Sequence, residues 1–153
     1  MELLIKNGTV VTDSGMFKAD IAVKDGKIIA VAENIEPESG AEIVNADGKL
    51  VLPGAIDAHT HLAMPFGGTI SSDDYFAGTR AAACGGTTTV FDFVLQDFGE
   101  TMVEAVKRRD KPCKPAAAVD YAYHVAIKDV SGDLINSIDE AVEYGVPSFK
   151  VFM

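Results

Sequence analysis

The sequence predicts an α/β fold of parallel strands joined by helices, preceded by a small all-β domain. In residues 1–52, Asp25-Gly26 and Asp47-Gly48 each separate two short apolar runs, a pattern typical of tight β-hairpins. After these residues, strand-like and helix-like segments alternate, which favours a parallel sheet with helical crossovers. Pro53-Gly54 interrupts both patterns, so we predict a domain boundary there and a second domain over residues 53–153.

The first domain is expected to be a small antiparallel sheet or sandwich, because its strand-like runs follow one another with no helix-like segment between them. Its predicted strand-forming segments are 3–12, 20–35 and 42–52.

The second domain is expected to contain three strand–helix units and the beginning of a further strand. β-branched and aromatic residues concentrate in the predicted strands, and glycine or proline follows each predicted helix. The predicted strands are 55–62, 87–95, 117–127 and 148–153, and the predicted helices are 71–84, 100–109 and 133–144. An open flavodoxin-like sheet and a closed eight-stranded barrel both fit this order. A barrel typically takes ~250 residues, so these residues would form slightly under half of one.

Composition and charge exclude several function classes. A net charge of −10 argues against binding to nucleic acid or anionic membranes, which needs clustered Lys and Arg. No apolar run approaches the ~18 residues of a membrane span, and no signal peptide is recognisable. Two cysteines, Cys84 and Cys113, do not make a secreted disulfide framework, so we expect reduced thiols and a cytoplasmic location.

Two histidines close the first predicted strand of the second domain. His59 and His61 are two residues apart, so in a strand their side chains point to the same face. Neutral imidazole is a common ligand of divalent transition metals. Spacing alone is equally compatible with two partly exposed histidines at a strand end.

Lys150 is the second informative residue, because it lies within the apolar run Ser148 to Met153. A lysine inside such a strand is costly unless it is paired or neutral. A neutral amine can add carbon dioxide to form a carbamate, whose two oxygens can bridge metal ions ~3.5–4 Å apart. The alternative is a lysine that extends from the strand end into solvent.

These motifs together resemble the amidohydrolase superfamily. The run Val51 to His61 resembles the first-strand signature of that superfamily, and residues 62–69, 85–89 and 148–153 are similar to its hydantoinase and dihydropyrimidinase branch. The Glu-Pro-Gly stretch that dihydroorotases and allantoinases carry after the histidines is lacking. Two departures are Ala63, where many hydantoinases have Asp, and Pro147, where Thr is common.

The resemblance covers the whole chain and implies a fold, a metal site and a substrate. The implied fold is the first four strands of a TIM-like (β/α)8 barrel in residues 53–153, with residues 1–52 forming half of a β-sandwich. It implies that His59 and His61 bind the more buried of two metals, and that Lys150 is a carboxylated catalytic residue bridging both. Apolar side chains around the substrate's exocyclic group are implied at Met64, Phe66, Leu95 and Phe152.

The implied activity is hydrolysis of a cyclic amide, a hydantoin or a dihydropyrimidine, by water activated between two divalent ions. Zinc suits imidazole and oxygen ligands best, with manganese or cobalt as substitutes, and carbon dioxide is needed to carboxylate Lys150. The expected partner is the small-molecule substrate, and the expected assembly is a homotetramer. His124, Asp57, Asp92, Tyr121 and Tyr123 are expected to be structural.

The branch also takes two further histidines and an aspartate general base from later strands. Residues 1–153 are therefore expected to be a piece of a longer chain and inactive alone. The alternatives are another cyclic amidohydrolase, of allantoinase or dihydroorotase type, a non-enzymatic scaffold like the collapsin response mediator proteins, or an inactive truncated product.

Overall fold

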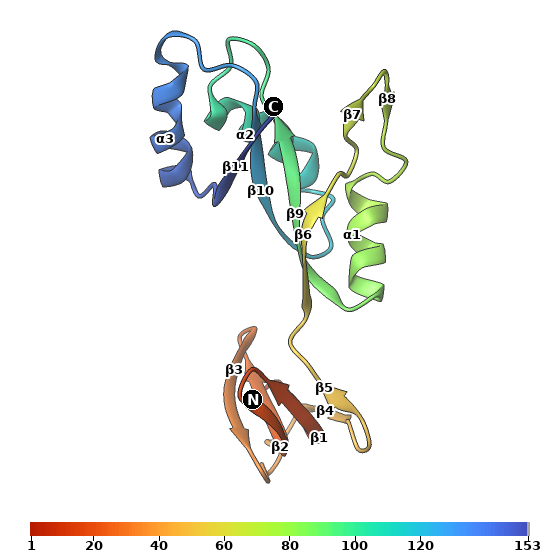
Figure 1. The fold of residues 1–153 in the computed structure, drawn as a ribbon. Helices are drawn as coiled ribbons and strands as arrows, with labels where there is room; N and C mark the ends of the chain where they lie inside the picture. Colours follow the sequence, from red (N-terminus) through yellow and green to blue (C-terminus); the bar gives the residue numbers. More distant parts are fainter. Residues whose placement is uncertain (153) are drawn as a thin grey trace. The chain divides into compact units, whose positions relative to one another are not determined.

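A computed structural model describes residues 1–152, which form two compact units (Figure 1). The first unit ends at Pro53 and the second begins at Gly54, so the division falls at the Pro53-Gly54 pair. Each unit is described separately below.

The first unit is one five-stranded mixed sheet. Strands β1, β2 and β3 form an antiparallel meander, whereas β4 and β5 both pair with β1 in parallel. The five strands are β1 Leu3–Thr12, β2 Gly15–Lys24, β3 Lys27–Ala32, β4 Glu42–Asn45 and β5 Leu50–Val51.

The prediction of a purely antiparallel arrangement is therefore wrong for β4 and β5. Residues 33–41 carry the chain from β3 to the other side of β1, where it runs in the direction of β1. Asp47-Gly48 lies in the turn between β4 and β5. These two strands each pair with β1 and not with each other. A sandwich needs a second layer, which residues 1–53 do not form by themselves, so the sandwich remains a prediction.

A buried carboxylate stabilises the sheet of the first unit. The Asp20 side chain is 2% exposed, accepts hydrogen bonds from the backbone N–H groups of Asn7 and Ile35, and pairs with the Lys6 ammonium at 3.3 Å. Burial alone would raise the pKa of Asp20, but these hydrogen bonds and Lys6 hold it below its ordinary value. The carboxylate therefore joins β1, β2 and the segment that follows β3.

The second unit is a four-stranded parallel sheet in the order β11-β10-β9-β6, with three helices (Figure 1). The predicted α/β alternation is therefore confirmed. The strands are β6 Ala55–Thr60, β9 Thr87–Leu95, β10 Asp120–Ile127 and β11 Ser148–Val151, and the helices are α1 Tyr75–Cys84, α2 Met102–Cys113 and α3 Ser137–Tyr144. A short hairpin of β7 Pro65–Phe66 and β8 Thr69–Ile70 was not predicted.

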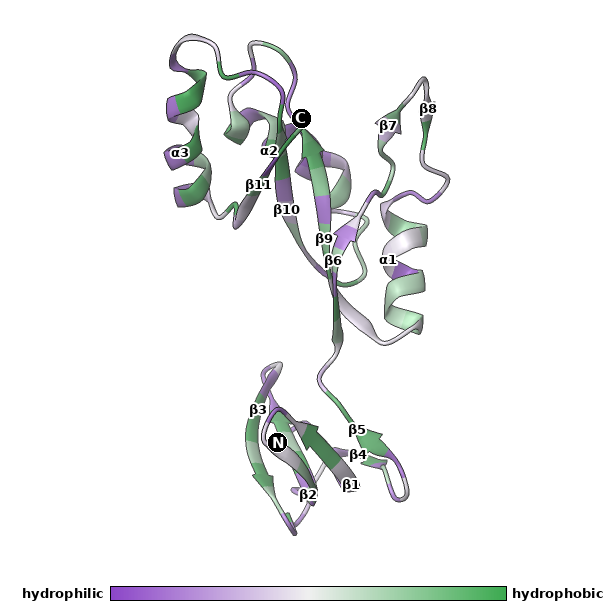
Figure 2. Cartoon of the chain, viewed as in Figure 1, coloured by the Kyte–Doolittle hydropathy of each residue, from purple (hydrophilic) through white to green (hydrophobic). Residues whose placement is uncertain are grey.

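All three helices pack on one face of this sheet. Val94 and Val125 point from β9 and β10 into a core shared with residues of α1, α2 and α3. The alternate positions Phe93 and Ala126 lie in a separate apolar cluster with Met64. Because side chains alternate along a strand, the sheet has one face for the helices and one face for the site described below. Figure 2 shows green, hydrophobic stretches along β9 and β10.

The ends of the helices differ from prediction in two places. Asp74, rather than Ser71 or Ser72, caps α1 by accepting the Ala77 N–H at 2.7 Å. Helix α2 continues through Pro112, where the prediction had it end before Lys111. A proline in the last turn removes one hydrogen bond but has a φ that the helix accepts. The expected glycine cap of α3 is confirmed, since Gly145 has a φ of 110°.

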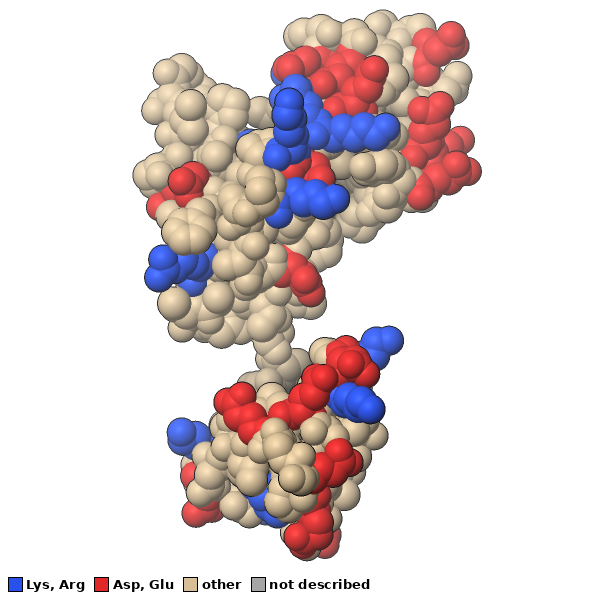
Figure 3. Space-filling view, turned by 180° about the vertical axis from the view of Figure 1, so that it is seen from behind, with Lys and Arg blue, Asp and Glu red and all other residues tan. Residues whose placement is uncertain are grey.

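Acidic side chains gather over α3, which carries Asp139, Glu140 and Glu143 (Figure 3). Such a face repels the phosphates of nucleic acid. Among the helices of residues 1–152, none is long and apolar enough to cross a membrane.

Candidate metal and substrate site

The candidate site lies at the carboxyl ends of the parallel strands. His59 is on β6 and His61 follows its end, Phe93 is near the end of β9, and Lys150 is on β11. Parallel strands place these ends along the same edge of the sheet, where ligands bind in α/β folds. Residues nearly a hundred positions apart in the sequence are thereby brought together.

The two predicted histidine ligands face each other. The Nε2 atoms of His59 and His61 are 3.1 Å apart, and the two rings meet edge to face at a centroid distance of 4.9 Å. The backbone N–H of His59 donates to Asp57 at 3.1 Å, which fits the structural role expected of Asp57. The expected convergence of the two imidazoles is therefore found.

The surroundings favour neutral imidazole at His61. Burial lowers the pKa of His61, and the nearby positive charges of His59, Lys150 and Arg109 lower it further, against an opposing contribution from Asp92. Neutral imidazole carries the lone pair that a metal requires.

Phe93 is the residue that joins the cluster together, and the sequence analysis missed it. Its ring centroid lies 4.6 Å from that of His59 and 5.0 Å from that of His61. The Lys150 Nζ lies 4.8 Å from the same centroid. His59, His61 and Lys150 are therefore on one side of the sheet. Strand parity could have revealed Phe93, because it shares a face of β9 with Leu95.

The Lys150 amine lies among aromatic rings. Besides Phe93, the ring of Phe152 is 5.4 Å from Nζ. No carboxylate of residues 1–152 is within ion-pair distance of this half-buried amine. Among the described residues, aromatic rings rather than carboxylates are therefore the neighbours of the Lys150 amine.

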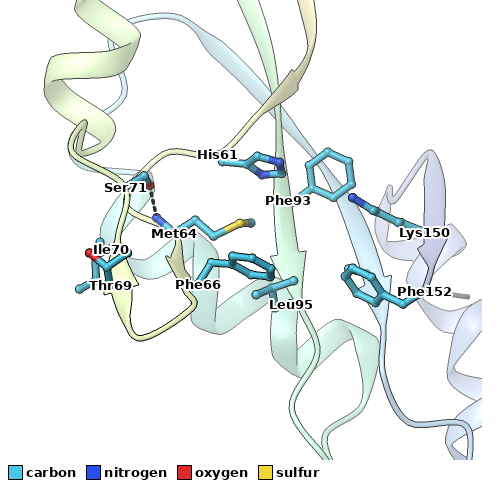
Figure 4. A pocket seen from close by; sticks show the side chains of 11 residues that line it. His61, Met64, Phe66, Thr69, Ile70, Ser71, Phe93, Leu95, Lys150 and Phe152 are labelled. Carbon is cyan, nitrogen blue, oxygen red and sulfur yellow. Dashed lines mark hydrogen bonds between the residues drawn. The ribbon is translucent and has the colours of Figure 1, made fainter.

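An apolar cavity of about 380 Å³ opens beside the cluster (Figure 4). Its volume is that of a small-molecule site. His61 and Lys150 line it, and so do all four residues predicted to surround a substrate: Met64, Phe66, Leu95 and Phe152. The β7–β8 hairpin contributes one wall through Phe66, Thr69 and Ile70. Their roles toward a substrate remain predictions.

His124 is on the same face of the sheet as the histidine pair, with its ring centroid 4.9 Å from that of Phe93, but its ring nitrogens contact other groups. Its Nε2 is 2.9 Å from the carbonyl oxygen of Ala58 on β6, and its Nδ1 contacts the Ser148 hydroxyl on β11. The ring therefore connects three strands of the sheet, and its structural role remains a prediction. The hydroxyls of Tyr121 and Tyr123 both donate hydrogen bonds to the Asp110 carboxylate. Within residues 1–152, no three or more His, Cys, Asp or Glu side chains form a cluster that could hold a metal ion.

Comparison with known proteins matches both units. The family model of the amidohydrolase family matches residues 50–142, and that of the urease alpha-subunit N-terminal domain matches residues 1–54. D-hydantoinase from Geobacillus stearothermophilus is 46% identical over 100% of this chain and 32% of its own length. Dihydropyrimidinase from Dictyostelium discoideum is 46% identical over 99% of this chain and 30% of its own length. The chain thus spans about a third of the length of these curated relatives.

Solved structures of D-hydantoinase and dihydropyrimidinase also match this chain. A crystal structure of D-hydantoinase has a TM-score of 0.94 at 44% identity, over 100% of this chain and 33% of that one. That of dihydropyrimidinase from Brevibacillus agri NCHU1002 has a TM-score of 0.94 at 40% identity, with the same coverage. The amidohydrolase family model matches more than half of the residues of this chain, so the chain belongs to the amidohydrolase family.

Proposed function

We propose that the intact protein opens the ring of a cyclic amide, a hydantoin or a dihydropyrimidine, at a two-metal centre that includes His59, His61 and Lys150. One observation carries the proposal. These three side chains contact the ring of Phe93, and His61 and Lys150 also line the adjacent apolar cavity. The chain is similar over its whole length to proteins named D-hydantoinase and dihydropyrimidinase.

The geometry of the histidine pair fits a shared metal ion. Two nitrogens that each lie 2.0–2.1 Å from a tetrahedral zinc ion are ~3.3 Å apart. The Nε2 atoms of His59 and His61 are already 3.1 Å apart. Without a metal, the two nitrogens can share only one proton in a hydrogen bond. A metal ion between them would accept the lone pairs of both nitrogens. Imidazole favours zinc, and manganese or cobalt could replace it.

Lys150 fits the role of a bridging carbamate. In its neutral form the amine would attack the carbon of carbon dioxide. A nitrogen–carbon bond would form while the electron pair of one carbon–oxygen π bond moves onto oxygen, and the nitrogen would then lose one proton to water. The product is a carboxylate with two oxygens, where an ammonium offers no lone pair. No carboxylate among residues 1–152 is in ion-pair contact with this amine, so no salt bridge holds it in the charged form.

The residues of this chain would hold the metals and exclude water from the substrate. Two divalent ions, when bound, lower the pKa of water and polarise a carbonyl. His59 on β6, His61 directly after β6 and Lys150 on β11 would hold the two ions. Met64, Phe66, Leu95 and Phe152 give the adjacent cavity an apolar wall that suits a substituent on the ring carbon.

The finer structural predictions are part of the same proposal. The four parallel strands would belong to a closed eight-stranded barrel, and residues 1–52 to half of a β-sandwich. We further propose a homotetramer in the cytoplasm, where the free thiols Cys84 and Cys113 would stay reduced.

The proposal is tested by assaying ring opening by the intact, zinc-loaded protein on hydantoin, dihydrouracil, allantoin and dihydroorotate. We expect hydantoin or dihydrouracil to be opened fastest, and removal of the metals by a chelator to stop the reaction. Preference for allantoin or dihydroorotate would assign the protein to another cyclic amidohydrolase class. A metal-loaded protein that opens none of the four would contradict the proposal.

Phe66 is predicted to select substrates by their ring substituent. Its side chain is 72% exposed, so it supports little of the fold, yet it lines the cavity. In the intact protein, Phe66→Ala should raise KM for an aryl-substituted hydantoin roughly tenfold, the equivalent of ~1.4 kcal/mol of lost apolar contact. KM for unsubstituted hydantoin should change little. Phe98→Ala is the control, because Phe98 is also exposed but lies outside the cavity. Equal effects of both substitutions on the aryl substrate would refute the assignment.

A further inference from the structure

A buried ion pair contacts the segment that directly follows His61. Asp92 on β9 has a side chain only 1% exposed, and the Arg109 side chain on α2 is 11% exposed. The Arg109 Nη2 and the Asp92 Oδ2 are 2.7 Å apart, and Nε donates to the same oxygen at 3.2 Å. Tyr75 completes the group, because its hydroxyl donates to Asp92 at 3.2 Å and the Arg109 guanidinium stacks on its ring at 5.0 Å.

Both members of this ion pair bind the backbone of the two residues after His61. The Asp92 Oδ1 accepts the N–H of Leu62 at 3.1 Å. Arg109 donates to the carbonyl of Leu62 and, through Nη1 at 3.1 Å, to the carbonyl of Ala63. One carboxylate and one guanidinium therefore bind three of the four backbone polar groups of Leu62 and Ala63.

That turn is conformationally strained. Ala63 has a φ of 45°, in the left-handed region where a residue with a Cβ costs about 1–2 kcal/mol. Its N–H donates to the Asp73 carbonyl at 2.7 Å, so the turn is supported from a second direction as well. A strained conformation persists only where surrounding contacts determine it, and here Arg109 and Asp92 supply most of them.

Stability alone is a poor explanation for such a pair. Burying two charges is expensive, and an apolar replacement of similar volume is often neutral or stabilising. The pair does, however, set the path of the chain immediately after a proposed metal ligand. An error of about 1 Å in the placement of a reacting or ligating group can have a large effect on chemistry.

We propose that Asp92 and Arg109 are positioning residues of the metal centre, which hold the Leu62–Ala63 turn and thereby orient the imidazole of His61 toward that of His59. The proposal rests on the proposed function, since it assumes that the two imidazoles bind a metal. Contacts of this kind, behind a ligand, are typically worth a factor of 10–100 in metal affinity.

The test uses the intact protein loaded with cobalt(II) or zinc(II), and the variant Arg109→Met. We expect metal affinity, measured by competition with a chelator, to fall roughly 10–100-fold and the visible absorption spectrum of bound cobalt to change. If Asp92 is left buried without a partner and the variant fails to fold, Asp92→Asn combined with Arg109→Met removes that charge. The control is Arg80→Met, since Arg80 is an exposed arginine on α1 that stacks on Phe76 at 5.2 Å. Its spectrum and affinity should match the wild type.

A folded Arg109→Met or double variant with the cobalt spectrum and metal affinity of the wild type would overturn the inference and leave the proposed function intact. A wild-type protein that binds neither cobalt nor zinc would overturn the proposed function, and this inference with it. Cooperative unfolding of each variant, followed by circular dichroism, distinguishes a repositioned ligand from an unfolded protein.

Discussion

Lys150→Ala in the intact protein is expected to abolish loading of the metal pair and to lower ring-opening activity by roughly a thousandfold or more, because the bridge between the ions is lost. The amine is within the same cluster as His59 and His61 around Phe93, and among the described residues Lys150 is the one lysine that lines the cavity. The measurement is metal content per chain together with the rate of hydantoin opening.

Chemical rescue sharpens this prediction. Alanine leaves a space at position 150 beside the cavity, and a short carboxylic acid such as acetate can supply the two missing oxygens there. We expect added acetate or bicarbonate to restore part of the metal content and activity of Lys150→Ala, but not of a His61→Ala variant. Full activity of Lys150→Ala without any additive would contradict the carbamate role.

Residues 1–153 expressed alone are expected to aggregate and to hydrolyse no cyclic amide. Strand β11 pairs only with β10 among the described residues, and an uncovered apolar edge promotes association between chains. Large apolar side chains are also exposed on β3, β4 and β11, where Ile28 is 64%, Ile43 52% and Val151 66% exposed.

The proposed metal site would also be incomplete in residues 1–153. It contains two histidines and a lysine, and no further group of three or more metal-binding residues occurs within residues 1–152. Metal binding contributes to folding, so a partial ligand set adds little stability to a partial core. Solubility, cooperative unfolding and dihydrouracil hydrolysis of the expressed segment provide the test. A soluble, cooperatively folding and active product would show that these residues suffice.

Local patterns in the sequence predicted the parts of the site that depend on strand parity. His59 and His61 are two residues apart on an extended segment, and their side chains do face each other. Lys150 was assigned to the same centre through the resemblance, and its amine contacts the same phenylalanine as both histidines. The alternation of strands and helices was equally visible, because its periodicity is local.

Features that depend on tertiary pairing could not be read from the sequence. Strands β4 and β5 lie parallel to β1 because of the path taken by residues 33–41, which no local pattern encodes. Asp92 was expected to be structural, but its partner Arg109 is a helix residue seventeen positions away that resembles any surface arginine. Its burial becomes visible only when α2 is packed against β9.

Metal analysis of the intact protein tests the central claim most directly. The wild type should contain two divalent ions per chain, and the combined variant His59→Asn/His61→Asn should lose the ion held by these residues while it still unfolds cooperatively. This experiment tests whether the two Nε2 atoms, which are 3.1 Å apart, bind a metal ion together. A folded double variant that retains both ions would show that the histidine pair is not a metal site.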